Sequence, residues 1–127
     1  MTSDELKRRT KQFALRVMKL VDALPRTTTG RAIGGQLVRS GTSVGANYRA
    51  ACRGRSKAEF AAKVGTVAEE ADESCFWLEL IIEGQFVPEH LVQPLLEEAN
   101  ELTAIFTASA KTTRLTNQQS RINNRKS

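Results

Sequence analysis

The side chains best suited to chemistry in this sequence are pairs of carboxylates and a single histidine. Glu69 and Glu73 are four residues apart, as are Glu79 and Glu83, so each pair would share one face of a helix. Di-metal four-helix proteins carry such carboxylates together with an inward-facing Glu-x-x-His motif on each of two helices. The sequence contains no Glu-x-x-His motif, and we interpret its one histidine, His90, as a surface residue. We therefore expect no metal site and no catalytic residues, and the chain is not expected to be an enzyme.

A glycine-rich stretch, residues 30–51, is the next candidate for a ligand site. It lacks the Lys-Ser/Thr ending of a phosphate-binding loop and follows no predicted strand, so we expect no cofactor there. Its larger apolar residues instead keep helical spacing, and Gly34, Gly41 and Gly45 fall on one flank of that stripe. We interpret these glycines as helix-packing positions that a neighbouring helix approaches closely. Asn47 lies at the margin of the stripe and is expected to be a hydrogen-bonded, buried polar group.

The elements that must position these residues are four amphipathic helices. Apolar residues recur at helical spacing over residues 3–24, 29–53, 57–83 and 88–110, and strand signals are absent. Short connections between such helices predict an all-α fold, an antiparallel up-down-up-down four-helix bundle formed by residues 1–110. Residues 111–127 carry two large aliphatic side chains and no aromatic one, so we expect a basic tail that is disordered when free.

The expected helix boundaries follow from capping residues. Ser3 and Ser56 are predicted N-caps of the first and third helices, because a serine hydroxyl accepts a hydrogen bond from a free backbone N–H of the first turn. Pro25 ends the first helix, since the residue before a proline is pushed out of the helical region. Gly54 is predicted to close the second helix in a left-handed conformation, and Gly84 to stop the third.

The formal net charge of +5 conceals a strong asymmetry along the chain. Residues 1–57 hold 13 Lys and Arg against 3 Asp and Glu, whereas residues 58–110 hold 1 against 11. Residues 111–127 add 5 basic residues and no acidic one. A basic half and a basic tail are typical of proteins that bind RNA or DNA through phosphates. The candidate nucleic-acid-binding residues are Arg31, Arg39, Arg49, Arg53, Arg55 and Lys57.

The same arginines have a second interpretation. Basic surfaces also serve as solvated faces or as protein interfaces, and no base-reading motif accompanies these residues. An alternative is therefore a protein–protein scaffold or adaptor, in which the basic surface pairs with the acidic third helix of a neighbouring subunit or of a partner protein. Such head-to-tail contacts close into rings when the rotation between subunits allows it.

Three apolar residues of the third helix lie away from its core-facing seam: Phe76, Trp77 and Leu80. Apolar side chains that a bundle core cannot absorb are typical of an interface, so we expect these three to form a homo-oligomer contact, in a ring rather than a simple dimer. The alternative is that the third helix twists enough to bury Trp77 at the edge of the core.

Composition restricts the cellular setting. No run of 18 apolar residues exists, and the first residues have no apolar segment of the kind that secretory signals carry, so we expect a cytoplasmic protein without a membrane partner. Two cysteines, Cys52 and Cys75, are too few for a disulfide framework or a zinc site and are interpreted as buried free thiols.

The segments GRAIGGQLVRSGTSVGANYRAACRGRSKAEFAAKV and EEADESCFWLELI together resemble the bacterial four helix bundle protein family. That family includes proteins encoded in intervening sequences of large-subunit ribosomal RNA genes. The matching features are Gln36, Ser43 with Asn47, Phe60, and the acidic helix that reaches Trp77, and the resemblance covers about residues 10–108. It implies a four-helix bundle that assembles as a pentameric ring. The chain is also similar to the accessory variability protein of diversity-generating retroelements, which implies nucleic acid and a reverse transcriptase or another protein as partners.

Overall fold

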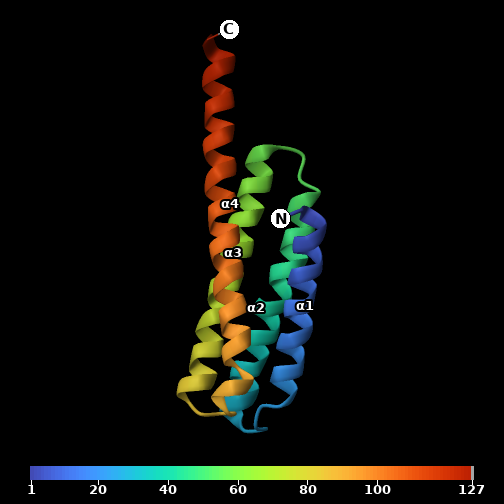
Figure 1. Cartoon of the computed structure of the whole chain (residues 1–127), viewed down its shortest axis with the longest axis vertical. Coiled ribbons are helices and arrows are strands. Elements are labelled where there is room, and N and C mark those ends of the chain that lie inside the picture. The colour runs from blue at the N-terminus through green and yellow to red at the C-terminus, as the bar shows by residue number, and fades with distance from the viewer. Residues whose placement is uncertain (127) are drawn as a thin grey trace.

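The computed structural model of the chain describes residues 1–126. Its elements are α1 (Ser3–Asp22), α2 (Thr28–Cys52), α3 (Lys57–Glu83), a single 3-10 turn η1 (Glu89–Leu91) and α4 (Gln93–Lys126). Successive helices run antiparallel, with α2 packed on α1, α3 on α2, and α4 on α3 (Figure 1). No strand occurs in residues 1–126, so the predicted all-α fold of four helices is confirmed.

The first three helices begin at hydroxyl side chains, as capping chemistry requires. Thr27 caps α2, and Ser56 caps α3 as predicted. The predicted cap of α1 is wrong by one residue, because Thr2 takes this place instead of Ser3. The Thr2 hydroxyl accepts from the backbone N–H of Glu5 at 3.1 Å, and the Glu5 carboxylate accepts from the N–H of Thr2 at 3.3 Å. Only this register lets glutamate stand three residues after the cap and complete a capping box.

The predicted left-handed conformation of Gly54 is also wrong. No glycine of residues 1–126 has a positive φ, and the one positive value in that range belongs to Gln85, at 56°. Gly54 is required for space rather than for its dihedral angles, because a Cβ there would lie 3.0 Å from the Ala51 carbonyl oxygen and 3.4 Å from the Phe60 nitrogen. The chain therefore passes from α2 to α3 through a tight, crowded turn.

The fourth helix extends further than the sequence indicates. The sequence predicts an end near residue 110, whereas α4 continues to Lys126; residues 111–126 form a helical extension whose last part projects beyond the bundle (Figure 1). The extension contains no proline or glycine, and each residue added to an existing helix gains a backbone hydrogen bond without a new nucleation step. Side chains also bond back one turn, as when the Thr113 hydroxyl donates to the Ser109 carbonyl at 2.8 Å. The last residue of the expected disordered tail, 127, lies outside the described residues.

The core contains large side chains from all four helices. Phe13 of α1, Leu37 of α2, Leu78 of α3 and Phe106 of α4 are completely buried. The ring of Tyr48 lies 5.1 Å from that of Phe106, measured between centroids, and so connects α2 to α4 across the bundle. Burial of an aliphatic or aromatic side chain of this size contributes about 1.5–3 kcal/mol, so these contacts hold the helices in register.

Three glycines of α2 face α1. A Cβ on Gly41 would lie 2.9 Å from both γ-methyl carbons of Val17, and a Cβ on Gly45 would lie 3.3 Å from the Thr10 hydroxyl. A Cβ on Gly34 would lie 3.0 Å from a γ-methyl carbon of Val21. The two helix backbones therefore approach closely along this line, and the side chains that flank it are brought to a common surface.

Candidate functional site

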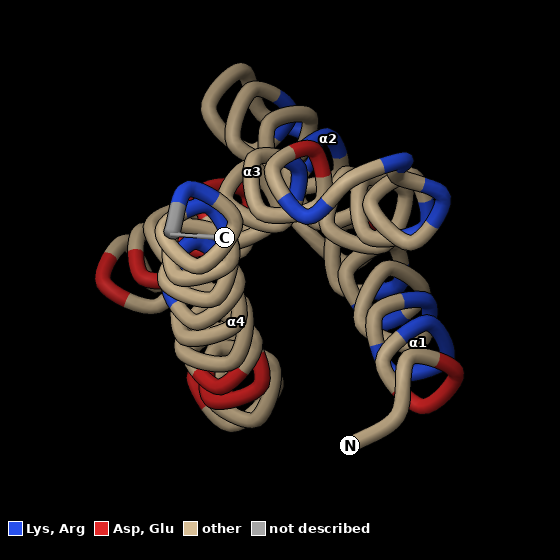
Figure 2. The backbone as a smooth tube through the Cα atoms, turned by 90° about the horizontal axis from the view of Figure 1, so that it is seen from above, with Lys and Arg blue, Asp and Glu red and all other residues tan. Residues whose placement is uncertain are grey.

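Charge divides the surface into two sides. Lys and Arg lie along α1, along α2 and around the connection from α2 to α3, whereas Asp and Glu gather on α3 and on the first half of α4 (Figure 2). We call the Lys and Arg of residues 1–57 the basic side and the Asp and Glu of residues 58–110 the acidic side. The exposed carboxylates of the acidic side include Glu69, Asp72, Glu79, Glu83, Glu97 and Glu101.

Five of the six candidate nucleic-acid-binding residues are exposed cations without a carboxylate within ion-pair distance in the described part of the chain. They do not form one cluster. Arg53, Arg55 and Lys57 lie together around the connection from α2 to α3, with Arg49 one helical turn before them. Arg31 lies near the other end of α2, about 33 Å from Arg53 at 1.5 Å per residue. A single phosphate could not contact both ends of this helix.

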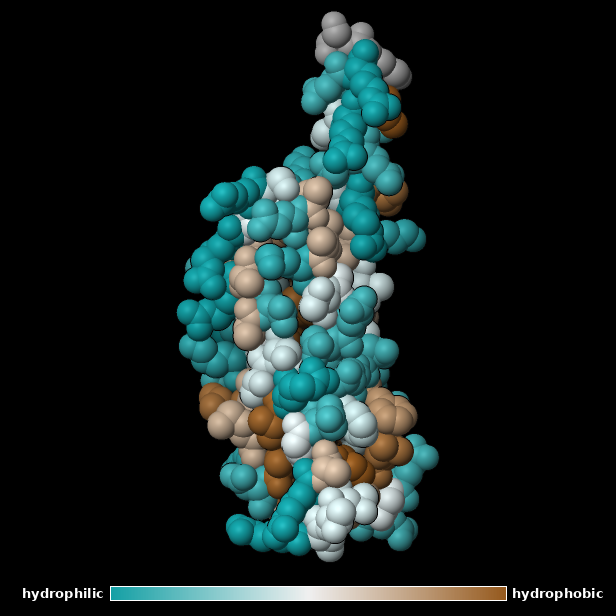
Figure 3. Space-filling model, turned by 180° about the vertical axis from the view of Figure 1, so that it is seen from behind, coloured by the Kyte–Doolittle hydropathy of each residue, from teal (hydrophilic) through white to brown (hydrophobic). Residues whose placement is uncertain are grey.

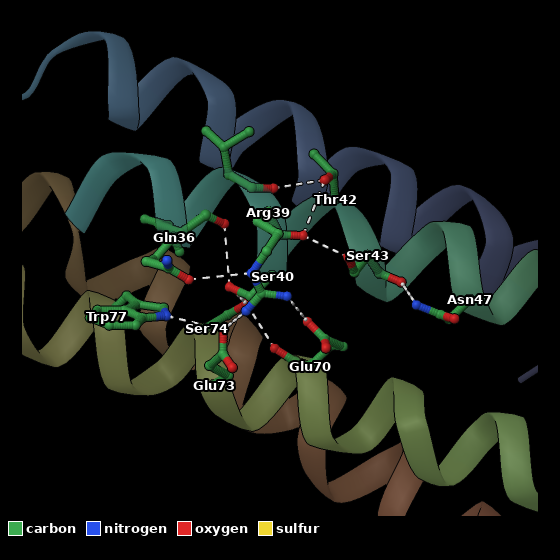
Figure 4. Close-up of polar contacts among 12 residues, drawn as sticks. Gln36, Arg39, Ser40, Thr42, Ser43, Asn47, Glu70, Glu73, Ser74 and Trp77 are labelled. Carbon is green, nitrogen blue, oxygen red and sulfur yellow. Dashed lines mark hydrogen bonds and ion pairs between the residues drawn. The ribbon is translucent and has the colours of Figure 1, made fainter. Parts of the chain in front are cut away.

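The sixth candidate, Arg39, is also exposed, but carboxylates of α3 pair with it at the surface (Figure 4). One terminal nitrogen lies 3.1 Å from a carboxylate oxygen of Glu70, and the other contacts Glu73. Its Nε donates to the side-chain oxygen of Gln36 at 3.3 Å, and the Trp77 indole N–H donates to Glu73 at 3.2 Å. The charge of Arg39 is therefore compensated within the chain, and this residue connects α2 to α3.

Beneath this network, α2 and α3 are joined by a buried pair of hydroxyls. The oxygens of Ser40 and Ser74 lie 2.9 Å apart, and Ser74 is also placed to donate to the Glu70 carbonyl at 2.9 Å. Asn47 lies further along α2, where it is half-buried and donates to the Ser43 carbonyl at 2.9 Å. These polar groups are satisfied within the bundle and have a structural role.

Arg9 forms the main polar connection between α1 and α4. Its Nε and one terminal nitrogen each lie 2.7 Å from a carboxylate oxygen of Glu98, and the same terminal nitrogen lies 3.3 Å from Glu101. The hydrogen bonds that Arg9 donates to Glu98 raise the pKa of Arg9, against the opposing effect of partial burial. The sequence alone does not predict this pair, because the two residues are 89 positions apart and no local pattern relates them.

The three residues expected at an oligomer interface have different environments. Phe76 is 51% exposed, whereas Trp77 and Leu80 are half-buried, and Trp77 packs against the core. The Phe76 and Trp77 rings contact edge to face with centroids 5.1 Å apart. Apolar side chains also gather on the surface near the end of the bundle where α1 and α3 finish (Figure 3). Leu15, Met18 and Leu91, which the sequence analysis did not single out, are each about half exposed.

The groups that could act as nucleophiles or metal ligands are dispersed or buried. Burial raises the pKa of Cys75, whose sulfur lies 3.4 Å from the side-chain oxygen of Asn100. Burial, followed by interaction with Cys52, raises the pKa of Tyr48 above its usual value.

No group of three His, Cys, Asp or Glu side chains in residues 1–126 is arranged to hold a metal ion. Within that range, none of the helices is both long enough and apolar enough to cross a lipid bilayer.

The first helix adds cations that the sequence analysis did not single out. Lys7 and Lys11 lie on the side of α1 that faces α2, where they surround a small groove together with Arg49. The signal for this arrangement is present in the sequence, since Lys7, Lys11 and Ala14 recur at steps of four and three residues and therefore share one face. Which helix that face would meet could not be read from the spacing.

Comparisons with known proteins agree with this architecture. A family model described as 23S rRNA-intervening sequence protein matches residues 4–108. A solved structure of a protein with unknown function from the S23 ribosomal protein family of Bacteroides thetaiotaomicron is similar, with a TM-score of 0.79 and 29% sequence identity. That similarity covers 87% of this chain and 99% of the other. No curated protein sequence is significantly similar. The helical extension, residues 111–126, lies beyond the segment that matches the family model.

Proposed function

Because the chain belongs to the 23S rRNA-intervening sequence protein family, we propose that it is a non-enzymatic accessory protein that binds RNA or DNA with low specificity. The observation that carries this proposal is that most cations of the basic side form no ion pair in the described part of the chain. Ion pairs in residues 1–126 engage only Arg9 and Arg39, so the other exposed arginines and lysines are available to phosphates. Phosphate contacts supply most of the affinity of non-specific nucleic-acid binding.

We expect binding that does not depend on the base sequence, because the basic side has no exposed aromatic ring in the described residues. Proteins that bind single strands stack bases on exposed aromatic rings. The aromatic residues that α1 and α2 contribute, Phe13 and Tyr48, are both buried, so within the described residues these helices offer no stacking platform. Binding through the backbone or the shape of the nucleic acid is the mode that remains.

We propose further that the protein acts as a homo-oligomer, a pentameric ring in the form that its family resemblance implies. The exposed ring of Phe76, with Trp77 and Leu80 beside it, is the expected contact. Adjacent apolar side chains that remain exposed on a surface are typical of a protein interface. A ring would also repeat the basic side around its circumference and so multiply weak phosphate contacts.

The test of nucleic-acid binding is fluorescence anisotropy with a labelled stem-loop RNA and a labelled duplex DNA at two salt concentrations. Raising the salt from about 50 to about 200 mM should weaken binding about 3.5-fold for every phosphate contact on duplex DNA. Scrambling the base sequence should leave the affinity nearly unchanged. A protein that does not bind at the lower salt concentration, or whose affinity does not depend on salt, would contradict the proposal.

The second candidate function is a protein–protein scaffold, favoured by the separation of the basic and acidic sides. In this case Arg49 and Arg53 would pair with the acidic α3 of a neighbouring subunit, or with an acidic helix of a partner protein such as a reverse transcriptase. The variant Arg49→Glu with Arg53→Glu separates the two functions. Loss of the oligomer in light scattering would favour the scaffold, whereas an intact oligomer that no longer binds nucleic acid would favour the nucleic-acid-binding protein.

A further inference from the structure

A small groove lies between α1 and α2, and its walls are unusual in composition. Its volume is about 160 Å³. Gly45, where α2 approaches Thr10 of α1 closely, is one of its lining residues, and the alanines beside it are also short. The lining residues are Lys7, Lys11 and Ala14 from α1, with Thr42, Gly45, Ala46 and Arg49 from α2.

Every charged residue that lines the groove is positive. Lys7, Lys11 and Arg49 line it, and none of them forms an ion pair within residues 1–126. Lys7 and Lys11 are also four residues apart on one helix, where like charges repel. Three uncompensated cations around one depression raise the energy of the free protein, and a bound anion would remove that repulsion.

The hydrogen-bonding groups of the groove also favour an anion. The hydroxyl of Thr42 donates to the Val38 carbonyl at 2.7 Å, so its proton is not available to a ligand. Glycine and alanine side chains offer no polar group. Among the lining residues, the side chains that still have donors for a ligand are those of Lys7, Lys11 and Arg49, and guanidinium matches the geometry of phosphate oxygens.

The size of the groove restricts the anion. Sites for whole small molecules enclose about 300–1,000 Å³, which is more than this groove provides. A phosphate group carried on a longer molecule fits better than a complete nucleotide. From Arg49 the cations continue along the surface, because Arg53 stands one helical turn later on α2 and Arg55 follows in the connection to α3.

We infer that the α1/α2 groove is the principal phosphate subsite of the protein, and that it takes the phosphodiester backbone of a nucleic acid strand on Lys7, Lys11 and Arg49. This inference rests on the proposed function and makes it specific. It assigns two of the three cations to α1, and it gives Arg31 no part, because that residue lies about 27 Å from Arg49 along α2.

The test compares two variants that lose the same charge. The groove variant is Lys7→Gln, Lys11→Gln and Arg49→Gln. The matched control is Arg16→Gln, Lys19→Gln and Arg26→Gln, three exposed cations toward the other end of α1 and in its connection to α2. Anisotropy with a labelled duplex DNA is measured at about 50 and about 200 mM salt for both variants and for the wild type.

The groove variant should lose about three phosphate contacts. The ratio of its affinities at the lower and the higher salt concentration should therefore be about 40-fold smaller than the same ratio for the wild type. The control should show the same ratio as the wild type. The single variant Arg49→Gln, at an exposed position, should reduce this ratio about 3.5-fold and serves if the triple variant does not fold. Equal losses in the groove variant and the control, or a wild-type response in both, would overturn the inference but leave the proposed function intact.

The wild-type arm distinguishes the other failures. If the wild type does not bind duplex DNA at the lower salt concentration, the proposed function and the groove assignment both fail. Vesicles that contain an anionic phospholipid form a separate arm. Binding to these vesicles that depends on the groove, without binding to duplex DNA, would reassign the groove to a membrane surface and overturn the inference.

Discussion

Substitution of two glycines in α2 tests whether the close contact with α1 controls the stability of the bundle. Gly41 and Gly35 are both interior positions of the same helix, so alanine should stabilise the helix by up to about 1 kcal/mol at either site. The surroundings differ. A Cβ on Gly35 would meet no atom within 4 Å, whereas a Cβ on Gly41 would lie 2.9 Å from both γ carbons of Val17, which is completely buried.

The magnitude follows from the geometry around Gly41. Both branches of Val17 are contacted at once, so rotation of this side chain would not make room, and the helices must separate by a few tenths of an ångström. Overpacking of this kind costs about 1–3 kcal/mol. After the gain in helix propensity, Gly41→Ala should destabilise the protein by about 0–2 kcal/mol, while Gly35→Ala should stabilise it by up to about 1 kcal/mol.

The assay is urea unfolding followed by circular dichroism, with all proteins at the same concentration because an oligomer would make stability depend on it. The free energy of unfolding of Gly41→Ala should be about 1–3 kcal/mol below that of Gly35→Ala. If Gly41→Ala stabilised the protein as much as Gly35→Ala, the contact between α1 and α2 would be looser than the structure indicates and the reasoning would be refuted.

Three further predictions concern single contacts. Arg9→Ala should lower the free energy of unfolding by about 1–2 kcal/mol, because it removes two charge-assisted hydrogen bonds to Glu98 at a partly buried site, and a double-mutant cycle with Glu98→Ala should show coupling between the two residues. Phe76→Ser should lower the free energy of unfolding by no more than about 1.5 kcal/mol, because the ring is half exposed and its edge-to-face contact with Trp77 is the interaction lost, but should reduce the mass measured by light scattering if Phe76 holds an oligomer together. Burial raises the pKa of Cys75 in the folded protein, so the stability that its neutral thiol contributes is complete below the ordinary thiol pKa of 9.0 and is lost as the pH rises through the folded pKa. Above pH 9.0 the unfolding temperature of the wild type should therefore fall more steeply with pH than that of Cys75→Ala.

The sequence by itself determined the four helices. Hydrophobic spacing and capping residues act over three or four positions, so α3 begins after Ser56 and ends at Gly84 as predicted. Local patterns are less reliable where two adjacent residues could both cap the same helix. Thr2 and Ser3 are both good caps, and only the glutamate at position 5 selects the first. The length of α4 was underestimated because a polar helix that continues from a bundle needs no apolar stripe of its own.

Only the tertiary structure decided which cations are available to a ligand. Arg39 and Arg49 look equivalent in the sequence, as arginines of one glycine-rich helix. The rotation of α2 against α3 places Arg39 against Glu70 and Glu73, whereas the contact with α1 places Arg49 beside Lys7 at an unpaired basic groove. Helix periodicity is a property of neighbouring residues, but the compensation of a charge depends on which helix lies opposite and in what register. That information is fixed by the packing of all four helices together.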